Sequence, residues 1–288
     1  MTRALSALLA VIAAVVLPGP AHAQTATTPS NVTMEVDPTL PTHTVYRPTA
    51  MEKLGRRKLP IIAFGNGSCF DNGAGYSNLL TGVAEHGYLV IALGPIGGSG
   101  RQLPRGVRAT EPAQLIEAID WAVKENDRAD SKFHARLDTK AIAVMGHSCG
   151  ALQALEVAGD PRIKTEVILN GGVFADLSAR PGWTVTKAHL AHLHETLLYL
   201  AGGPDDIAHE TANDDFGYID GVPLFKGETD VGHMATYEEP NGGLFGKVVG
   251  AWLDWQLKND QKAKLMFTGE NCGLCTDKAW TVARKNMR

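Results

Sequence analysis

The sequence has no excess of positive charge, with 27 Lys and Arg residues against 31 Asp and Glu residues and a formal net charge of −4. A chain of this balance offers no basic surface for nucleic acid, so we expect no nucleic-acid partner. Beyond its first residues it also lacks any apolar run of membrane-spanning length, and it has no internal repeat and no low-complexity linker. These absences leave a single folded domain as the expected organisation.

The N-terminus carries a short apolar run of about 14 residues, from Ala4 to Leu17, after the basic Arg3. Small residues follow at Ala21 and Ala23, which is the pattern of a secretory signal peptide over residues 1–23. A membrane anchor is the alternative, but the run is shorter than the roughly 20 residues that span a bilayer. We therefore expect export to the periplasm or the medium and no membrane contact after cleavage.

Apolar strand-like runs alternate with helix-like segments along residues 58–260. Such alternation predicts an α/β domain with a mostly parallel central sheet flanked by helices, here over residues 24–260. The polar segment 261–288 carries a Cys-x-x-Cys pair and is predicted to be a small C-terminal extension. The expected strands are 59–67, 88–96, 141–146, 165–172, 196–203 and 222–230, and the expected helices are 76–87, 113–126, 149–159, 187–194, 209–219 and 243–260.

One Gly-x-Ser-x-Gly pentapeptide, Gly146 to Gly150, stands between an expected strand and an expected helix. Alone the pentapeptide is a weak signal, because a glycine-rich chain produces it by chance. The strand-to-helix context is what identifies a nucleophile elbow, in which flanking glycines permit a sharp turn that exposes the serine hydroxyl. We therefore expect Ser148 to be a nucleophile.

Candidate partners follow in the order acid, then histidine, that this kind of turn predicts. Asp205 and Asp206 lie in a glycine-rich turn after one strand, and His233 lies in the loop after the next. Both carboxylates are also ordinary turn residues, and the sequence alone does not separate them. The other histidines lie earlier in the chain or off the expected loops.

Stabilising an oxyanion requires two hydrogen-bond donors. The expected pair is the N–H of Cys149 and an N–H from the loop after the first long strand, where Ser68 and Cys69 are both candidates. A plain strand-to-helix turn is the alternative interpretation of that loop.

These motifs together resemble the α/β-hydrolase superfamily, near its dienelactone-hydrolase-like and cutinase-like secreted esterases. The likeness covers about residues 58–260 and rests on "FGNGSC", "GHSCG", "GGPDDIA" and "DVGHMATY". It implies an α/β-hydrolase fold and ester hydrolysis, and acyl transfer through a serine requires no metal or organic cofactor. Only residues 172–195 separate two of the expected strands, which leaves room for little or no lid. The resemblance also implies Ser148 as nucleophile, His233 as base and Asp206, rather than Asp205, as acid.

Cys149 stands where many esterases have a larger apolar residue, and Cys69 lies in the opposite loop. A Cys69–Cys149 disulfide would make the proposed oxyanion hole rigid, with Cys272 and Cys275 paired locally. Cys149 as a free buried residue is the alternative, since four cysteines allow three connectivities. A zinc site at Cys272 and Cys275 is not expected, because no second ligand pair follows at suitable spacing.

An open cleft would accept a small-molecule ester or a bulky or polymeric one, with Phe70, Trp183 and Tyr237 as candidate apolar walls. A serine peptidase, a non-catalytic binding protein and a thiol oxidoreductase are the competing interpretations. The natural ester and the oligomeric state are not assigned by the sequence.

Overall fold

The computed structural model describes residues 31–100, 107–177 and 183–287. The predicted signal peptide, its cleavage point and residues 178–182 of the segment expected to leave little room for a lid lie outside the described residues. Within the described residues, no helix combines the length and the apolar character that crossing a bilayer requires.

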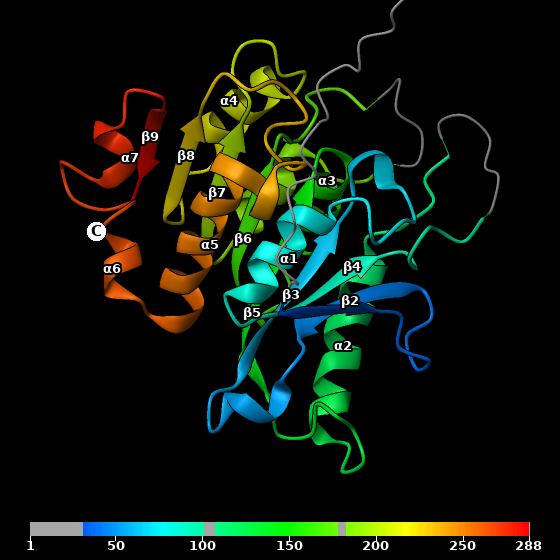
Figure 1. Cartoon of the computed structure of the whole chain (residues 1–288). Helices are drawn as coiled ribbons and strands as arrows, with labels where there is room; N and C mark the ends of the chain where they lie inside the picture. The colour runs from blue at the N-terminus through cyan, green and yellow to red at the C-terminus, as the bar shows by residue number, and fades with distance from the viewer. Residues whose placement is uncertain (1–30, 101–106, 178–182, 288) are drawn as a thin grey trace, which may run out of the picture. The chain divides into compact units, whose positions relative to one another are not determined.

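The centre of the fold is one nine-stranded sheet (Figure 1). Its middle six strands, from β4 to β8, run parallel, and the three outer strands pair antiparallel with their neighbours. The predicted α/β class with a mostly parallel sheet is confirmed. The spatial order is β1 (Val32–Glu35), β2 (His43–Pro48), β4 (Leu89–Leu93), β3 (Leu59–Gly65), β5 (Leu137–His147), β6 (Ile163–Leu169), β7 (Thr196–Ala201), β8 (Leu224–Glu228) and β9 (Thr281–Lys285).

Helices cover both faces of this sheet, which explains why the neighbouring strands β3 and β4 are apolar throughout. Every residue of β3 and β4 is buried. On one face α2 (Ala113–Asp127), α3 (Cys149–Val157) and α4 (His209–Tyr218) pack on one hydrophobic cluster. On the other face α1 (Ser77–Glu85) and α5 (Gly243–Lys258) pack on a second cluster.

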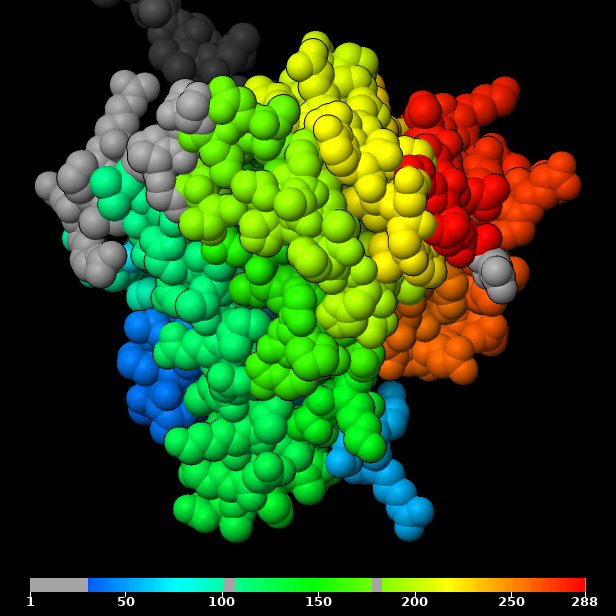
Figure 2. Space-filling view, turned by 180° about the vertical axis from the view of Figure 1, so that it is seen from behind, coloured from blue at the N-terminus to red at the C-terminus, as the bar shows by residue number. Residues whose placement is uncertain are grey.

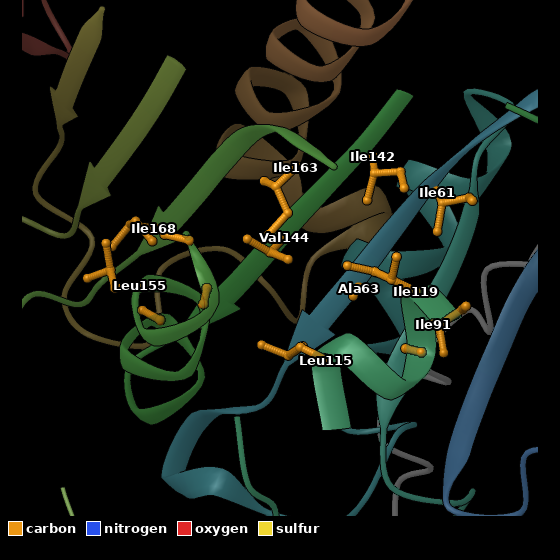
Figure 3. Close-up of a cluster of buried hydrophobic side chains, with 14 of the residues drawn as sticks. Ile61, Ala63, Ile91, Leu115, Ile119, Ile142, Val144, Leu155, Ile163 and Ile168 are labelled. Carbon is orange, nitrogen blue, oxygen red and sulfur yellow. The ribbon is translucent and has the colours of Figure 1, made fainter. Parts of the chain in front are cut away.

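Helical spacing of apolar residues determines which side of each helix is buried. In α2, Leu115 and Ile119 are four residues apart and both are fully buried against the sheet. Figure 3 shows them facing Ile91 and Ala63 of the neighbouring strands. Each such side chain contributes roughly 1.5–3 kcal/mol through burial. Figure 2 views the molecule from the α2 and α3 side.

Two segments have features that the sequence did not predict. The expected short helix near residue 190 is a 3₁₀-helix over residues 187–192, with the Thr186 and His189 side chains capping its first turn. In the predicted C-terminal extension 261–288, β9 pairs antiparallel with β8, and Phe267 and Trp280 are buried in the same hydrophobic cluster as residues of α1 and α5. The segment also contains α6 (Gln261–Lys264) and α7 (Gly273–Thr276).

The parallel strands bring four loop segments to one edge of the sheet. Ser148 follows β5, Asn170 follows β6, Asp206 lies in the turn after β7 and His233 lies in the loop after β8. The carboxyl ends of neighbouring parallel strands meet at the same edge, where open α/β sheets bind their ligands. Residues separated by 85 positions in sequence are thereby placed side by side.

Candidate active site

Ser148 lies on a strained turn between β5 and α3. Its φ is 52° and its ψ is −113°, values that a residue with a side chain rarely adopts. Its N–H donates to the Leu169 carbonyl at 2.9 Å, which holds the turn against the neighbouring strand. A Cβ on Gly146 would lie 2.1 Å from the Gly150 oxygen, and one on Gly150 would lie 2.0 Å from the Gly65 oxygen. The flanking glycines are therefore required by close backbone contact.

Ser148, His233 and Asp206 form a hydrogen-bonded chain. The Ser148 Oγ lies 3.0 Å from His233 Nε2, and His233 Nδ1 lies 2.7 Å from Asp206 Oδ1. Since an ionised carboxylate only accepts, Nδ1 carries the proton, and Nε2 accepts from the serine hydroxyl. The imidazole is thus oriented to remove a proton from Ser148.

Asp206 is the carboxylate that meets His233, and it is almost fully buried. Burial alone raises the pKa of Asp206, but hydrogen bonds from His233, from the Ala208 and Gly202 N–H groups and from Asn170 outweigh it. Together they lower the pKa to about 2, which keeps this carboxyl ionised. The neighbouring Asp205 is exposed, and of the two carboxylates it is Asp206 that is hydrogen-bonded to His233.

The loop after β3 carries Ser68 and Cys69, whose backbone N–H groups are the two loop candidates for the oxyanion hole. Ser68 and Cys69 both have positive φ, of 51° and 50°. The Cys69 N–H already donates to the Asn66 carbonyl at 3.1 Å, whereas the Ser68 N–H has no acceptor among the described residues. Cys149 is the first residue of α3, so its N–H has no partner within the helix. Of the two loop candidates left open by the sequence, the geometry therefore favours Ser68.

Disulfides join Cys69 to Cys149 and Cys272 to Cys275, as predicted, and no free cysteine remains. The first has a Cα–Cα distance of 5.3 Å and connects the loop of Ser68 directly to the residue after Ser148. The Cys69 carbonyl also accepts from the N–H groups of Ala109 and Thr110, at 3.1 and 3.2 Å. The position of this loop is therefore fixed by a covalent bond and by two backbone hydrogen bonds.

His147 connects three segments of the site behind the serine. Its Nε2 lies 2.9 Å from the carbonyl oxygen of His233, its Nδ1 lies 2.6 Å from the Tyr76 hydroxyl, and that hydroxyl accepts from the Gly67 N–H. Because a carbonyl only accepts, Nε2 carries the proton and Nδ1 accepts from Tyr76. Burial lowers the pKa of His147 to about 4, so the ring is neutral at pH 7.

A cleft of about 220 Å³ opens beside Ser148 and His233. Trp183 lies in its wall, as expected, and Arg108 lies over the Trp183 ring at 4.7 Å. The other two expected wall residues do not line it: Phe70 is 62% exposed outside the cleft, and Tyr237 is buried behind it, donating to Asn170. The remaining walls are mostly apolar, from Cys149, Leu152, Asn170, Gly171, Gly172, Phe174, Ile207, Ala208 and Thr211.

Two polar residues of the site were not identified from the sequence. Asn170 donates to Asp206, and Tyr76 donates to His147. The sequence does contain a signal for Asn170, because a polar residue directly after the strand 163–169 lies at the carboxyl end of a parallel strand, where ligand sites of such sheets are found. Within residues 31–100, 107–177 and 183–287, no group of three or more His, Cys, Asp or Glu side chains has a metal-binding arrangement.

A comparison with protein-family models gives no match for this chain, and a comparison with curated protein sequences gives none either.

Proposed function

We propose that the chain is an exported serine hydrolase of the α/β-hydrolase superfamily that cleaves carboxylic esters. The observation that carries the proposal is the chain of contacts from Ser148 Oγ through His233 to Asp206, with distances of 3.0 and 2.7 Å. It begins at a serine with a φ of 52° on a strand-to-helix turn, which is the geometry of a nucleophile elbow. Export is supported by the two disulfides, since such bonds persist in oxidising compartments.

The reaction proceeds in two half-reactions through an acyl-enzyme. His233 Nε2 removes the Ser148 proton as Oγ bonds to the ester carbonyl carbon, and the protonated ring is stabilised by Asp206. The tetrahedral intermediate then loses the alcohol, which takes the proton from His233. Water repeats the sequence on the acyl-enzyme and releases the acid, so no metal or organic cofactor takes part.

The oxyanion of each intermediate is stabilised by the backbone N–H groups of Ser68 and Cys149. Both groups are free of other acceptors among the described residues, and the Cys69–Cys149 disulfide fixes their separation. Donors held in place before the reaction lower the barrier because they need no reorganisation.

The cleft beside Ser148 takes an apolar part of the ester. Leu152, Phe174 and Trp183 supply large apolar surfaces, and the volume of about 220 Å³ suits a short acyl or alkyl group. The rest of a bulky or polymeric ester would lie outside, where Ile207 is 80% exposed at the rim. A pocket of this kind selects by size and apolar contact.

The test is hydrolysis of p-nitrophenyl esters from acetate to palmitate by the protein and its Ser148→Ala variant. We expect the variant to lose about 10³-fold or more in kcat, as removals of triad members do. Ser77→Ala is the matched control, because Ser77 begins α1 and is not part of the site. A fluorophosphonate, which phosphonylates activated serines, should add to Ser148 and to no other serine in a peptide map. Equal activity of wild type and Ser148→Ala on esters would contradict the proposal, and turnover of peptides alone would indicate a peptidase.

A further inference from the structure

Asn170 occupies a fixed point at the end of β6. Its N–H donates to the Leu200 carbonyl at 2.8 Å, and the residue is fully buried. Its φ is 44°, in the left-handed region that asparagine tolerates better than most residues with a side chain. The side chain therefore leaves the backbone from a defined position and in a defined direction.

The amide nitrogen of this side chain bridges the two loops that carry the acid and the base. Asn170 Nδ2 donates to Asp206 Oδ2 at 2.7 Å and to the carbonyl oxygen of Gly232 at 3.2 Å. Asp206 uses its other oxygen, Oδ1, to accept from His233. Gly232 is the residue directly before His233, so one amide group restrains both the carboxylate and the chain that carries the imidazole.

Tyr237 determines which way the amide of Asn170 points. The Tyr237 hydroxyl donates to Asn170 Oδ1, and burial raises the pKa of Tyr237, so this hydroxyl remains a donor. If the amide turned by 180°, its oxygen would face the Asp206 carboxylate and its NH₂ would face the tyrosine hydroxyl. The first contact would be repulsive, and both hydrogen bonds to Asp206 and Gly232 would be lost.

We propose that Asn170, held in one orientation by Tyr237, is a positioning residue that fixes Asp206 and the His233 loop relative to each other. The proposal rests on the proposed hydrolase function, in which Asp206 orients His233. Neither residue touches the reacting atoms in this role: Asn170 acts through Asp206, and Tyr237 acts through Asn170. The other titratable groups packed against this cluster are His147 and Tyr76, whose rings lie 5.0 and 5.6 Å from that of Tyr237.

Two substitutions separate this role from a purely structural one. Asn170→Gly removes the amide, and glycine adopts the left-handed conformation without strain. Asn170→Asp keeps the shape and the acceptor for Tyr237 but replaces the donor by an oxygen facing Asp206. At low pH the two carboxyls share a proton, which restores a hydrogen bond to Asp206 Oδ2. At higher pH that proton leaves and the two carboxylates repel each other.

We expect Asn170→Gly to lower kcat by about ten- to hundredfold at all pH values with a smaller change in KM, the loss expected for a charge-assisted hydrogen bond. Asn170→Asp should approach wild-type activity near pH 5 and fall toward the glycine variant by pH 8.5. Tyr237→Phe should lower kcat several-fold without adding pH dependence. Tyr88→Phe is the matched control, because it too removes the hydroxyl of a buried tyrosine that donates a hydrogen bond, in this case to Asp254 outside the site.

A second measurement does not need a substrate. The His233 Nδ1 proton, hydrogen-bonded to Asp206, should give a downfield proton resonance in the wild type. In Asn170→Asp it should be retained near pH 5 and shifted or lost by pH 8.5, and Tyr88→Phe should leave it unchanged. If folded Asn170→Gly and Asn170→Asp proteins keep this resonance as in the wild type at both pH values, the positioning role is wrong. A wild type that hydrolyses no ester but shows the expected resonance changes would instead contradict the proposed function alone.

Discussion

The imidazole of His147 donates from Nε2 to the backbone carbonyl of His233 at 2.9 Å. The residue before Ser148 therefore supports the backbone of His233, the proposed base, although the two histidines are 86 positions apart. This contact requires a neutral His147 with its proton on Nε2, and the Tyr76 hydroxyl at Nδ1 selects that tautomer.

Stability should fall as the pH falls through the range in which an unfolded His147 gains a proton. The native ring has a pKa of about 4, whereas an unfolded histidine protonates near its usual value of about 6.5. Between these values the unfolded chain binds more protons, so roughly 3 kcal/mol of unfolding free energy is lost from pH 7 to pH 4. Urea unfolding at pH 7 and pH 4.5 should show a smaller acid loss in His147→Gln than in the wild type. The exposed His134→Gln is the control; an acid loss in His147→Gln as large as in the wild type would contradict this assignment.

Asp206→Asn and Asp205→Asn should differ sharply in activity. Asp206→Asn removes the acceptor that fixes the His233 tautomer, and we expect kcat to fall by roughly 10³–10⁴-fold. Asp205→Asn, one residue away and exposed, should remain within about twofold of wild type. The kcat of both variants is measured by ester hydrolysis at pH 7.5. Comparable losses of kcat in the two variants would contradict the assignment of Asp206 as the carboxylate that orients His233.

The carboxylate of Asp206 also links stability to pH. Its native pKa of about 2 lies below the usual value near 3.9, so its hydrogen bonds add stability above about pH 4 that is lost as the pH falls toward 2. Asp206→Asn should therefore unfold with a weaker pH dependence than wild type between pH 4 and pH 2.5. A pH dependence in Asp206→Asn equal to that of wild type over this range would contradict the lowered pKa.

The two disulfides should contribute unequal amounts of stability. Cys69–Cys149 closes a separation of 80 residues, and Cys272–Cys275 closes one of 3. Loop-closure entropy then predicts about 4.5 kcal/mol for the first and less than 2 kcal/mol for the second. Urea unfolding of the Cys69→Ser/Cys149→Ser and Cys272→Ser/Cys275→Ser proteins measures the difference. Only loss of the first disulfide should also lower kcat, since that bond links the loop of Ser68 to Cys149, the two proposed oxyanion donors. Equal kcat losses in the two double variants would show that the Cys69–Cys149 bond has no special role in the site.

Glu166 in β6 should make the protein less stable as the pH rises. It is fully buried, both carboxyl oxygens lack hydrogen-bond partners among the described residues, and burial raises its pKa to about 8. Its native form is therefore protonated, and stability present below about pH 4.5 is progressively lost up to pH 8, by roughly 4 kcal/mol. Glu166→Met, which fills similar space without a charge, should remove this loss in urea unfolding at pH 5 and pH 8. The exposed Glu270→Gln is the control, and an unchanged pH slope in Glu166→Met would overturn the prediction.

The sequence predicted the order of strands and helices and brought Ser148, Asp206 and His233 together, because chain order and strand ends place them at one edge of the sheet. It did not separate Asp205 from Asp206, since the direction of a turn side chain depends on backbone contacts such as the Ala208 N–H to Asp206. The Cys69–Cys149 pairing could be predicted because the expected fold brings the loop after the first long strand close to the turn at Ser148.

Tyr237 and the C-terminal segment show what the sequence did not contain. An aromatic residue near a catalytic loop is equally consistent with a substrate wall and with a buried hydroxyl donor, and only the position of Asn170 decides. Similarly, residues 281–285, Thr-Val-Ala-Arg-Lys, show no alternation of polar and apolar residues. They form a strand because β8 offers unpaired backbone groups. Both outcomes depend on partners that are distant in the sequence.

The pairing of β9 with β8 has a consequence for how copies of this protein avoid one another. Without β9, the parallel sheet would end at β8 with a row of open N–H and C=O groups, a template for strand addition from a second molecule. The final strand occupies that edge, and Arg284 and Lys285 add charge beside it. A chain ending near residue 260 would keep every proposed catalytic residue and yet expose a surface prone to aggregation.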